Sequence, residues 1–219
     1  MSKFPMSYSR LSTFENCPQQ FDYLYVTKNV QVVESEAMAY GTRVHEALEM
    51  YAKSRDEKYL TRETRKWKSL IDRLLEKKGT HLYEYQMAVT PELEPCDWMA
   101  KDVWLRGIAD VLVVDGDTAY CLDWKTGKVR DNPTQLQLFA CMVFLHFPEV
   151  KTVKTAFVWL KFDQVTDMVY KRSMFDPMWR NLMQRFDYVQ ETIDLGVFEA
   201  KPSGLCRWCA ARDICPYGR

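Results

Sequence analysis

The order of apolar and polar residues along the chain predicts both helices and strands. Apolar residues recur every three or four positions over residues 37–54 and 176–196, which predicts two amphipathic helices. The other expected elements are strands over 81–89, 102–114 and 119–125, helices over 7–26 and 132–147, one or two exposed helices within 53–78, and a hairpin over 153–162 and 165–174. Pro18 is expected to kink the first helix or divide it in two. This order predicts a mixed α/β fold, with a small central mixed sheet flanked by helices.

Composition supports a folded core and limits the classes of partner. The chain has 219 residues, 47% of them hydrophobic and 14% aromatic, and its formal net charge is +0. Contact with a nucleic acid must therefore use a local patch. Residues 53–78 hold ten Lys and Arg against five Asp and Glu, a local balance of +5. This segment is either a solvated helical face or a surface for a DNA backbone.

The seven Cys residues point to thiols or metal ligands rather than disulfides. The longest apolar run, LFACMVFLHF, is too short to span a bilayer, and MSKFPMSYSR lacks the apolar core of a secretory signal. We therefore expect a cytoplasmic protein that has no membrane contact, in which disulfides are rare. The odd number of Cys also argues against a complete disulfide framework.

The segment RGIADVLVVDGDTAYCLDWKTGK is predicted to be a hairpin that carries two acids and a base. A turn centred between Gly116 and Asp117 would place Asp110 opposite Asp123, while a two-residue turn one position earlier would make them diagonal neighbours. Both registers put the two carboxylates on one face, with Lys125 beside Asp123. Two readings remain open on this pattern. Lys125 neutralises the acids in a surface ladder, or the acids bind a hard cation such as Mg²⁺ or Mn²⁺.

The residues GIADVLVVDG and LDWKTGK resemble the core of the PD-(D/E)xK nuclease superfamily, in particular its RecB-like branch, which includes CRISPR-adaptation exonucleases. In this resemblance Asp110 and Asp123 are the two acids and Lys125 is the lysine. Ala109 stands where the superfamily name has Pro, and Val111 stands where many relatives have Arg.

Two further motifs extend the resemblance. GTRVHEALE resembles a helix motif whose histidine binds metal, which implies His45 as a ligand. QLQLF resembles a Q-x-x-x-Y motif whose glutamine positions the lysine or DNA, which implies Gln135; Phe139 replaces the tyrosine. Without this context, a lone helical His or a polar residue in the first turn of a buried helix would be read as structural.

The cysteines near the two ends resemble the iron–sulfur staple of RecB-like nucleases. The set is one N-terminal Cys and a C-x2-C-x5-C motif: Cys17, Cys206, Cys209 and Cys215. Four thiolates suit a [4Fe–4S] cluster or Zn²⁺, and the resemblance favours the cluster. It also implies a single nuclease domain over residues 1–219, with a core over about 37–195 and a staple formed by about 7–26 and 196–219.

The resemblance implies an Mg²⁺- or Mn²⁺-dependent DNA exonuclease. The expected substrate is single-stranded DNA or DNA ends, in recombination, repair, or phage or CRISPR DNA processing. Metal would be held by His45, Asp110, Asp123 and the Trp124 main-chain carbonyl, while Lys125 would orient or deprotonate the attacking water, with Glu84 as an outer acid. The alternatives are a DNA-binding accessory subunit of a recombination or CRISPR complex, and a structural zinc module. Self-assembly or a partner protein is compatible with each.

Overall fold

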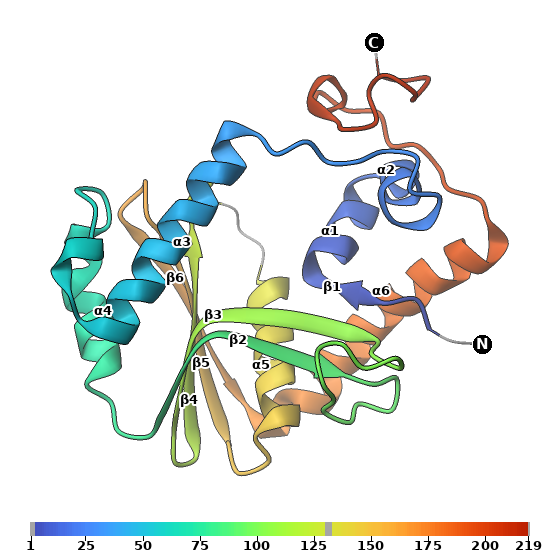
Figure 1. Ribbon diagram of the computed structural model, residues 1–219. Coiled ribbons are helices and arrows are strands. Elements are labelled where there is room, and N and C mark those ends of the chain that lie inside the picture. Colours follow the sequence, from blue (N-terminus) through green and yellow to red (C-terminus); the bar gives the residue numbers. More distant parts are fainter. Residues whose placement is uncertain (1–2, 130–132, 219) are drawn as a thin grey trace.

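A mixed β-sheet runs through the middle of the molecule and separates two layers of helices (Figure 1). The computed structural model describes residues 3–129 and 133–218. Its strands are β1 (Met6–Ser7), β2 (Thr80–Val89), β3 (Leu105–Asp115), β4 (Thr118–Lys125), β5 (Thr152–Trp159) and β6 (Gln164–Lys171). They lie in the order β1-β3-β4-β5-β6, and β2 pairs with the opposite edge of β3. The β1–β3 and β4–β5 pairs are parallel, whereas β2–β3, β3–β4 and β5–β6 are antiparallel.

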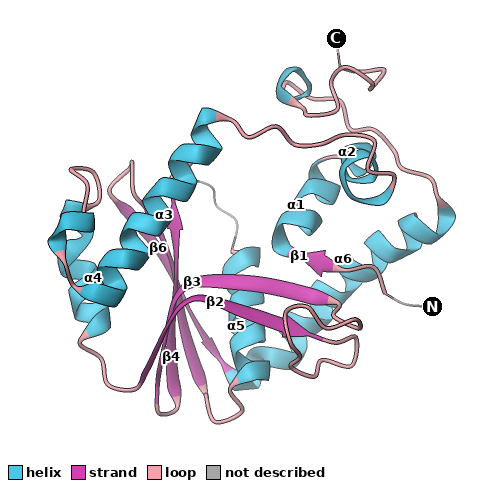
Figure 2. Cartoon of the chain, viewed as in Figure 1, coloured by secondary structure: helices cyan, strands magenta, loops and turns pink. Residues whose placement is uncertain are grey.

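The helices cover both faces of the sheet because its strands are apolar on both sides (Figure 2). The helices are α1 (Tyr8–Asn16), α2 (Pro18–Phe21), α3 (Glu36–Ser54), α4 (Lys68–Leu75), α5 (Thr134–His146) and α6 (Phe175–Leu195). Leu112 and Val114 of β3 pack into a cluster with α1, α5 and α6, and the alternate residues Val111 and Val113 pack with α3 and α4. Helix α5 is buried on nearly every side, since it lies between the sheet and α6. The predicted fold class is confirmed.

The structure confirms that the first helix is divided in two and corrects the helical segment within 53–78. The segment over 7–26 is divided at Cys17, which is extended and ends α1, and Pro18 begins α2; residues Asp22–Val26 then form a π-helical turn. After the end of α3 at Ser54, residues 55–78 contain α4 and 3₁₀ turns at Glu57–Tyr59 and Arg65–Trp67. Asn132, at the start of the predicted helix over 132–147, lies outside the described residues.

The segment 53–78 is partly buried, and part of its basic charge is paired with acids. Its apolar residues Trp67, Ile71 and Leu74 are buried beneath α3. Several of its basic residues pair with acids: Lys53 with Glu49, Arg55 and Lys68 with Asp72, Lys58 with Asp56, and Arg65 with Glu57. Among the described residues, four other basic side chains of the segment form no ion pair: Arg62, Arg73, Lys77 and Lys78. Unpaired positive charge that could meet a DNA backbone therefore remains there.

The hairpin adopts the first of the two predicted registers. Asp115 pairs with Thr118 across a Gly116–Asp117 turn, and Gly116 has a φ of 59°, which glycine adopts without strain. The β3–β4 ladder ends at the pair Val111–Leu122, although β3 continues to pair with β2 as far as Leu105. The two strands thus part at the next position, where Asp110 and Asp123 lie.

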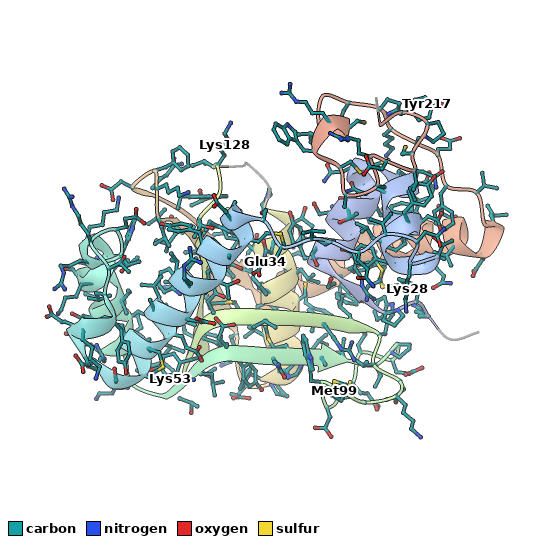
Figure 3. The ribbon with its side chains drawn as sticks, turned by 45° about the horizontal axis from the view of Figure 1, so that its top comes forward. Lys28, Glu34, Lys53, Met99, Lys128 and Tyr217 are labelled. Atoms are coloured by element: carbon teal, nitrogen blue, oxygen red, sulfur yellow. The ribbon has the colours of Figure 1, made fainter. Side chains whose placement is uncertain are left out.

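The two ends of the chain meet on one side of the molecule. The tail that follows α6 runs past α1 and α2 (Figure 1), and the N–H of Gln19 donates to the carbonyl of Glu199 at 3.3 Å. An exposed linker crosses from the π-helical turn to α3, running from Lys28 to Glu34 (Figure 3). Within the described ranges, no helix is both long and apolar enough to cross a membrane.

Candidate functional site

The candidate site lies where β3 and β4 part. Asp110 and Asp123 end the shared part of the ladder, and each is only 6% exposed. One carboxylate oxygen of Asp110, Oδ2, accepts a hydrogen bond of 2.6 Å from the main-chain N–H of Trp124. The side chain of Asp110 therefore accepts a hydrogen bond from a main-chain N–H that has lost its partner strand. Because both acids are buried, the surface-ladder interpretation of the hairpin is wrong.

Helix α3 brings His45 to this point. The ring atom Nδ1 of His45 lies 3.2 Å from Oδ1 of Asp110. Burial acts to lower the pKa of His45, but the hydrogen bond to Asp110 and the charges of Asp110, Asp123 and Glu84 outweigh it, so the pKa is raised. Gly41, one turn earlier on α3, would place a Cβ 3.3 Å from Oγ1 of Thr126, so glycine lets α3 approach the end of β4 closely.

Glu84 on β2 completes a cluster with His45 and Asp110. One ligand atom of each of the three residues lies within 4.8 Å of the others. Glu84 has a φ of 46°, a left-handed conformation that costs a non-glycine residue about 1–3 kcal/mol. Its pairing with Asp110 is missing from the ladder between Tyr83–Val111 and Tyr85–Ala109. Burial, and then the charge of Asp110, raise the pKa of Glu84 to about 7.

Gln135 connects the lysine of the hairpin to its acid. Nζ of Lys125 lies 2.6 Å from Oδ2 of Asp123 and donates to Oε1 of Gln135 at 2.9 Å. Nε2 of Gln135 donates to Oδ1 of Asp123 at 3.0 Å. Apart from this ion pair, Oδ2 of Asp123 is buried without a hydrogen-bond partner. Burial and the charge of Asp110 raise the pKa of Asp123, and Lys125 opposes them.

The donor set fits a hard divalent cation. Asp110, Asp123 and Glu84 offer carboxylate oxygens and His45 offers an imidazole nitrogen, a combination suited to Mg²⁺ or Mn²⁺. Three neighbouring carboxylates against one His and one Lys leave an excess of negative charge, which a divalent ion would neutralise. A cavity of about 450 Å³ beside the cluster is lined by His45, Glu84, Glu49 and the start of α3, so an ion has access. Trp124 is buried in β4, where it lies opposite Val158 of the parallel strand β5.

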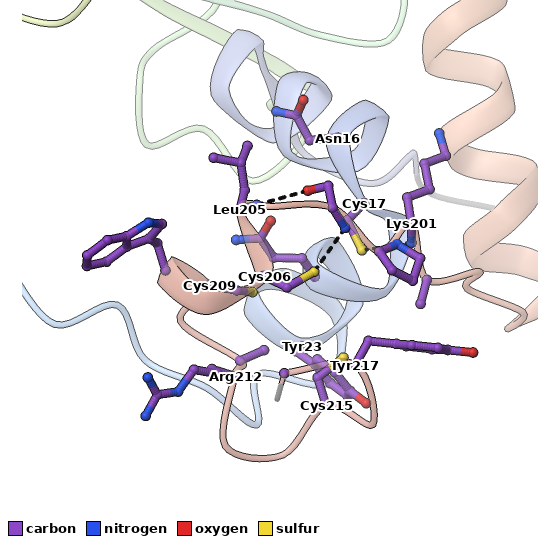
Figure 4. A pocket seen from close by; sticks show the side chains of 17 residues that line it. Asn16, Cys17, Tyr23, Lys201, Leu205, Cys206, Cys209, Arg212, Cys215 and Tyr217 are labelled. Carbon is purple, nitrogen blue, oxygen red and sulfur yellow. Dashed lines mark hydrogen bonds between the residues drawn. The ribbon is translucent and has the colours of Figure 1, made fainter.

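The four terminal cysteines line one cavity of about 460 Å³ (Figure 4). The main-chain N–H of Lys201 donates to Sγ of Cys17 at 3.4 Å, and that of Ser203 donates to Sγ of Cys206 at 3.2 Å. Such donors stabilise a thiolate. Burial raises the pKa of Cys209, a backbone N–H lowers it, and the three other thiols raise it again. No three of these described Sγ atoms lie within 4.8 Å of one another.

The site residues named from the sequence therefore fall into two groups. The hairpin residues, His45 and Gln135 meet around the end of β4, and the four cysteines meet around the second cavity. Glu84 received only a minor role from the sequence. The pairing of β2 with β3, which sets Glu84 beside Asp110, is the signal that could have given it a larger role.

Comparison with known proteins gives one family and several similar structures. A family model for the PD-(D/E)XK nuclease superfamily matches residues 5–216. The crystal structure of a protein called SSO0001 has a TM-score of 0.51 and 14% identity, and the match covers 100% of this chain and 89% of that one. A proposed exonuclease from Eubacterium rectale has a TM-score of 0.52 and 12% identity, with 98% and 88% covered. At these identities the two structures support the fold alone. No curated protein matches the chain.

Proposed function

The chain belongs to the PD-(D/E)XK nuclease superfamily, and from this we propose that it is a metal-dependent DNA exonuclease of the RecB-like branch. Its substrate is single-stranded DNA or DNA ends, in recombination, repair, or phage or CRISPR DNA processing. The observation that carries the proposal is the convergence of Asp110, Asp123 and Lys125 at one buried strand end, with Gln135 bonded to two of them. A protein that only bound DNA would have no need of buried, mutually repelling acids.

Asp110, Asp123 and His45 hold the metal, Mg²⁺ or Mn²⁺, and Glu84 adds a further carboxylate. The Trp124 main-chain carbonyl is a further ligand in this proposal. Bound there, the metal would polarise the scissile phosphate and make a water nucleophilic near neutral pH.

Lys125 orients or deprotonates the attacking water, and its positive charge offsets the negative charge that develops on the phosphate. Asp123 and Gln135 fix its ammonium group from two sides, so Lys125 is held before substrate arrives. Gln135 is a positioning residue that acts through Lys125 and Asp123.

The test is a time course on end-labelled linear DNA and on circular DNA, with Mg²⁺, with Mn²⁺ and with EDTA. We expect metal-dependent loss of the linear substrate, an uncut circle and no cleavage in EDTA. Lys125→Ala should abolish cleavage and leave the far-ultraviolet circular dichroism unchanged. Binding of DNA without cleavage under every metal condition would favour an accessory subunit instead.

The four cysteines bind a [4Fe–4S] cluster that joins the two ends of the chain around a single nuclease domain. Support comes from their shared cavity and from the N–H donors to Cys17 and Cys206.

A further inference from the structure

A second cavity adjoins the candidate active site and shares Gln135 with it. This cavity has a volume of about 350 Å³ and lies between the start of α1, the beginning of β3 and the first turn of α5. Its wall contains Ser7, Arg10, Trp98, Arg106, Gln135 and Phe139. Because Gln135 also contacts Lys125 and Asp123, a ligand in this cavity would lie directly beside the reacting groups.

The two arginines of this cavity have no acidic partner. Among the described residues, neither Arg10 nor Arg106 forms an ion pair with a carboxylate. Nε of Arg106 is buried without a hydrogen-bond partner, and its guanidinium lies 5.3 Å from the ring centre of Trp98. This cation–π contact orients the guanidinium and supplies no negative charge.

Arg10 is held in place by two aromatic rings and by a main-chain carbonyl. Its guanidinium lies 5.5 Å from the ring centre of Phe4 and 5.1 Å from that of Tyr25, and one of its nitrogens donates to the carbonyl of Pro5. Burial lowers the pKa of Arg10, Tyr25 acts to raise it, and the charge of Arg106 acts to lower it. The two guanidinium groups therefore repel each other across the cavity.

Two partly buried cations that repel each other are costly unless an anion joins them. The arginine fork matches a phosphate, to which it can donate two parallel hydrogen bonds. The N-terminal end of α1, capped by Ser7, adds partial positive charge on the same wall. The partly exposed ring of Trp98 offers a surface for a base.

We infer that this cavity is a nucleotide subsite, in which Arg10 and Arg106 bind a backbone phosphate next to the scissile one. The inference rests on the proposed nuclease function and deepens it. The cavity volume suits a group of small-molecule size and is too small for a duplex. The subsite therefore selects a single strand, whose next base stacks on Trp98.

The test is equilibrium binding of a fluorescein-labelled oligothymidylate of about ten nucleotides, in EDTA so that nothing is cut. Arg106→Gln and Arg10→Gln should each weaken binding about tenfold or more. Each should also reduce the slope of log Kd against log salt by about 0.7, one lost phosphate contact. Arg106→Lys keeps the charge but loses the forked guanidinium, so its affinity should lie between those of the native chain and of Arg106→Gln. Arg180→Gln, which changes an exposed arginine on α6, is the matched control and should bind as the native chain does.

Cleavage assays with Mn²⁺ complete the test, since the two arginine variants should raise KM more than they lower kcat. Native affinity and native salt slope in both glutamine variants would overturn the subsite while leaving the nuclease function intact. If the native chain cuts no DNA but the arginine variants still bind it more weakly, the subsite is supported and the nuclease function is excluded. Melting curves check that each variant is folded. If Arg106→Gln fails to fold, Arg10→Gln and Arg106→Lys decide the question.

Discussion

Gln135, in the first turn of α5, donates a hydrogen bond of 3.0 Å to Asp123 at the end of β4. The same amide accepts a hydrogen bond from Lys125, so one side chain fixes the separation of an acid and a base. Helix α5 is held in place by packing of its buried residues, and the hydrogen bonds of Gln135 connect it to the hairpin. The position of the lysine therefore depends on packing in the core as well as on the strand that carries it.

Replacing Gln135 with Ala should lower kcat about 10- to 100-fold, since a partner that orients an active-site group typically contributes that much. Lys125 would then be held by Asp123 alone and would sample other rotamers. Steady-state cleavage of end-labelled DNA measures the effect. Gln137→Ala is the matched control: Gln137 lies on the same helix and donates to the carbonyl of Met178, away from the site. Equal losses in the two variants would show that only the helix was disturbed.

Replacing Glu84 with Gln should weaken Mn²⁺ binding about 10- to 100-fold. The change keeps the size of the side chain but removes a carboxylate from the cluster with His45 and Asp110. The measurement is the rise in melting temperature as Mn²⁺ is added, because a ligand that binds only the folded state stabilises it in proportion to log concentration. Glu94→Gln, at an exposed loop position, is the control. An unchanged titration for Glu84→Gln would remove Glu84 from the metal site.

The hairpin residues could be predicted from the sequence because they lie close together along the chain. Asp110, Asp123 and Lys125 lie within one turn and two strands, and the period of a strand sets which side chains share a face. His45 and Gln135 were found through motifs whose residues lie on single helices. In each case a short segment carries the pattern.

Glu84 was predicted only as an outer acid, because its contact with His45 and Asp110 depends on tertiary structure. Its acid reaches the cluster through the pairing of β2 with β3 and through a left-handed φ of 46°. Neither property is encoded in a repeat of apolar residues. The segment 53–78 was misread for a related reason: its charged composition concealed Trp67, Ile71 and Leu74, which are buried by contacts with α3 and the sheet.

The stability of the chain should fall in mild acid partly because of His146. Burial lowers the pKa of this residue below 6.5, and a hydrogen bond to the carbonyl of Ala88 opposes the shift. Below about pH 6.5 the unfolded chain therefore binds a proton at this histidine more readily than the folded chain does. The stability that the neutral His146 contributes above pH 6.5 is lost as the pH falls. In His146→Gln the free energy of unfolding should depend less on pH between about pH 7 and pH 5. Urea unfolding of both proteins across this range measures it, and parallel curves would contradict the assignment to His146.

Replacing Cys206 with Ala should remove the metal group that joins the ends of the chain. Purified without oxygen, the native protein should contain about four irons and four sulfides and absorb in the visible range, and the variant should lose both. The melting temperature should fall by several degrees, since each kcal/mol lost shifts it by about 2–4 °C in a chain of this size. Cys96→Ala, outside the cavity, should keep its iron. One zinc and no sulfide in the native protein would contradict the cluster but retain a metal link, whereas unchanged iron in Cys206→Ala would exclude this cysteine as a ligand.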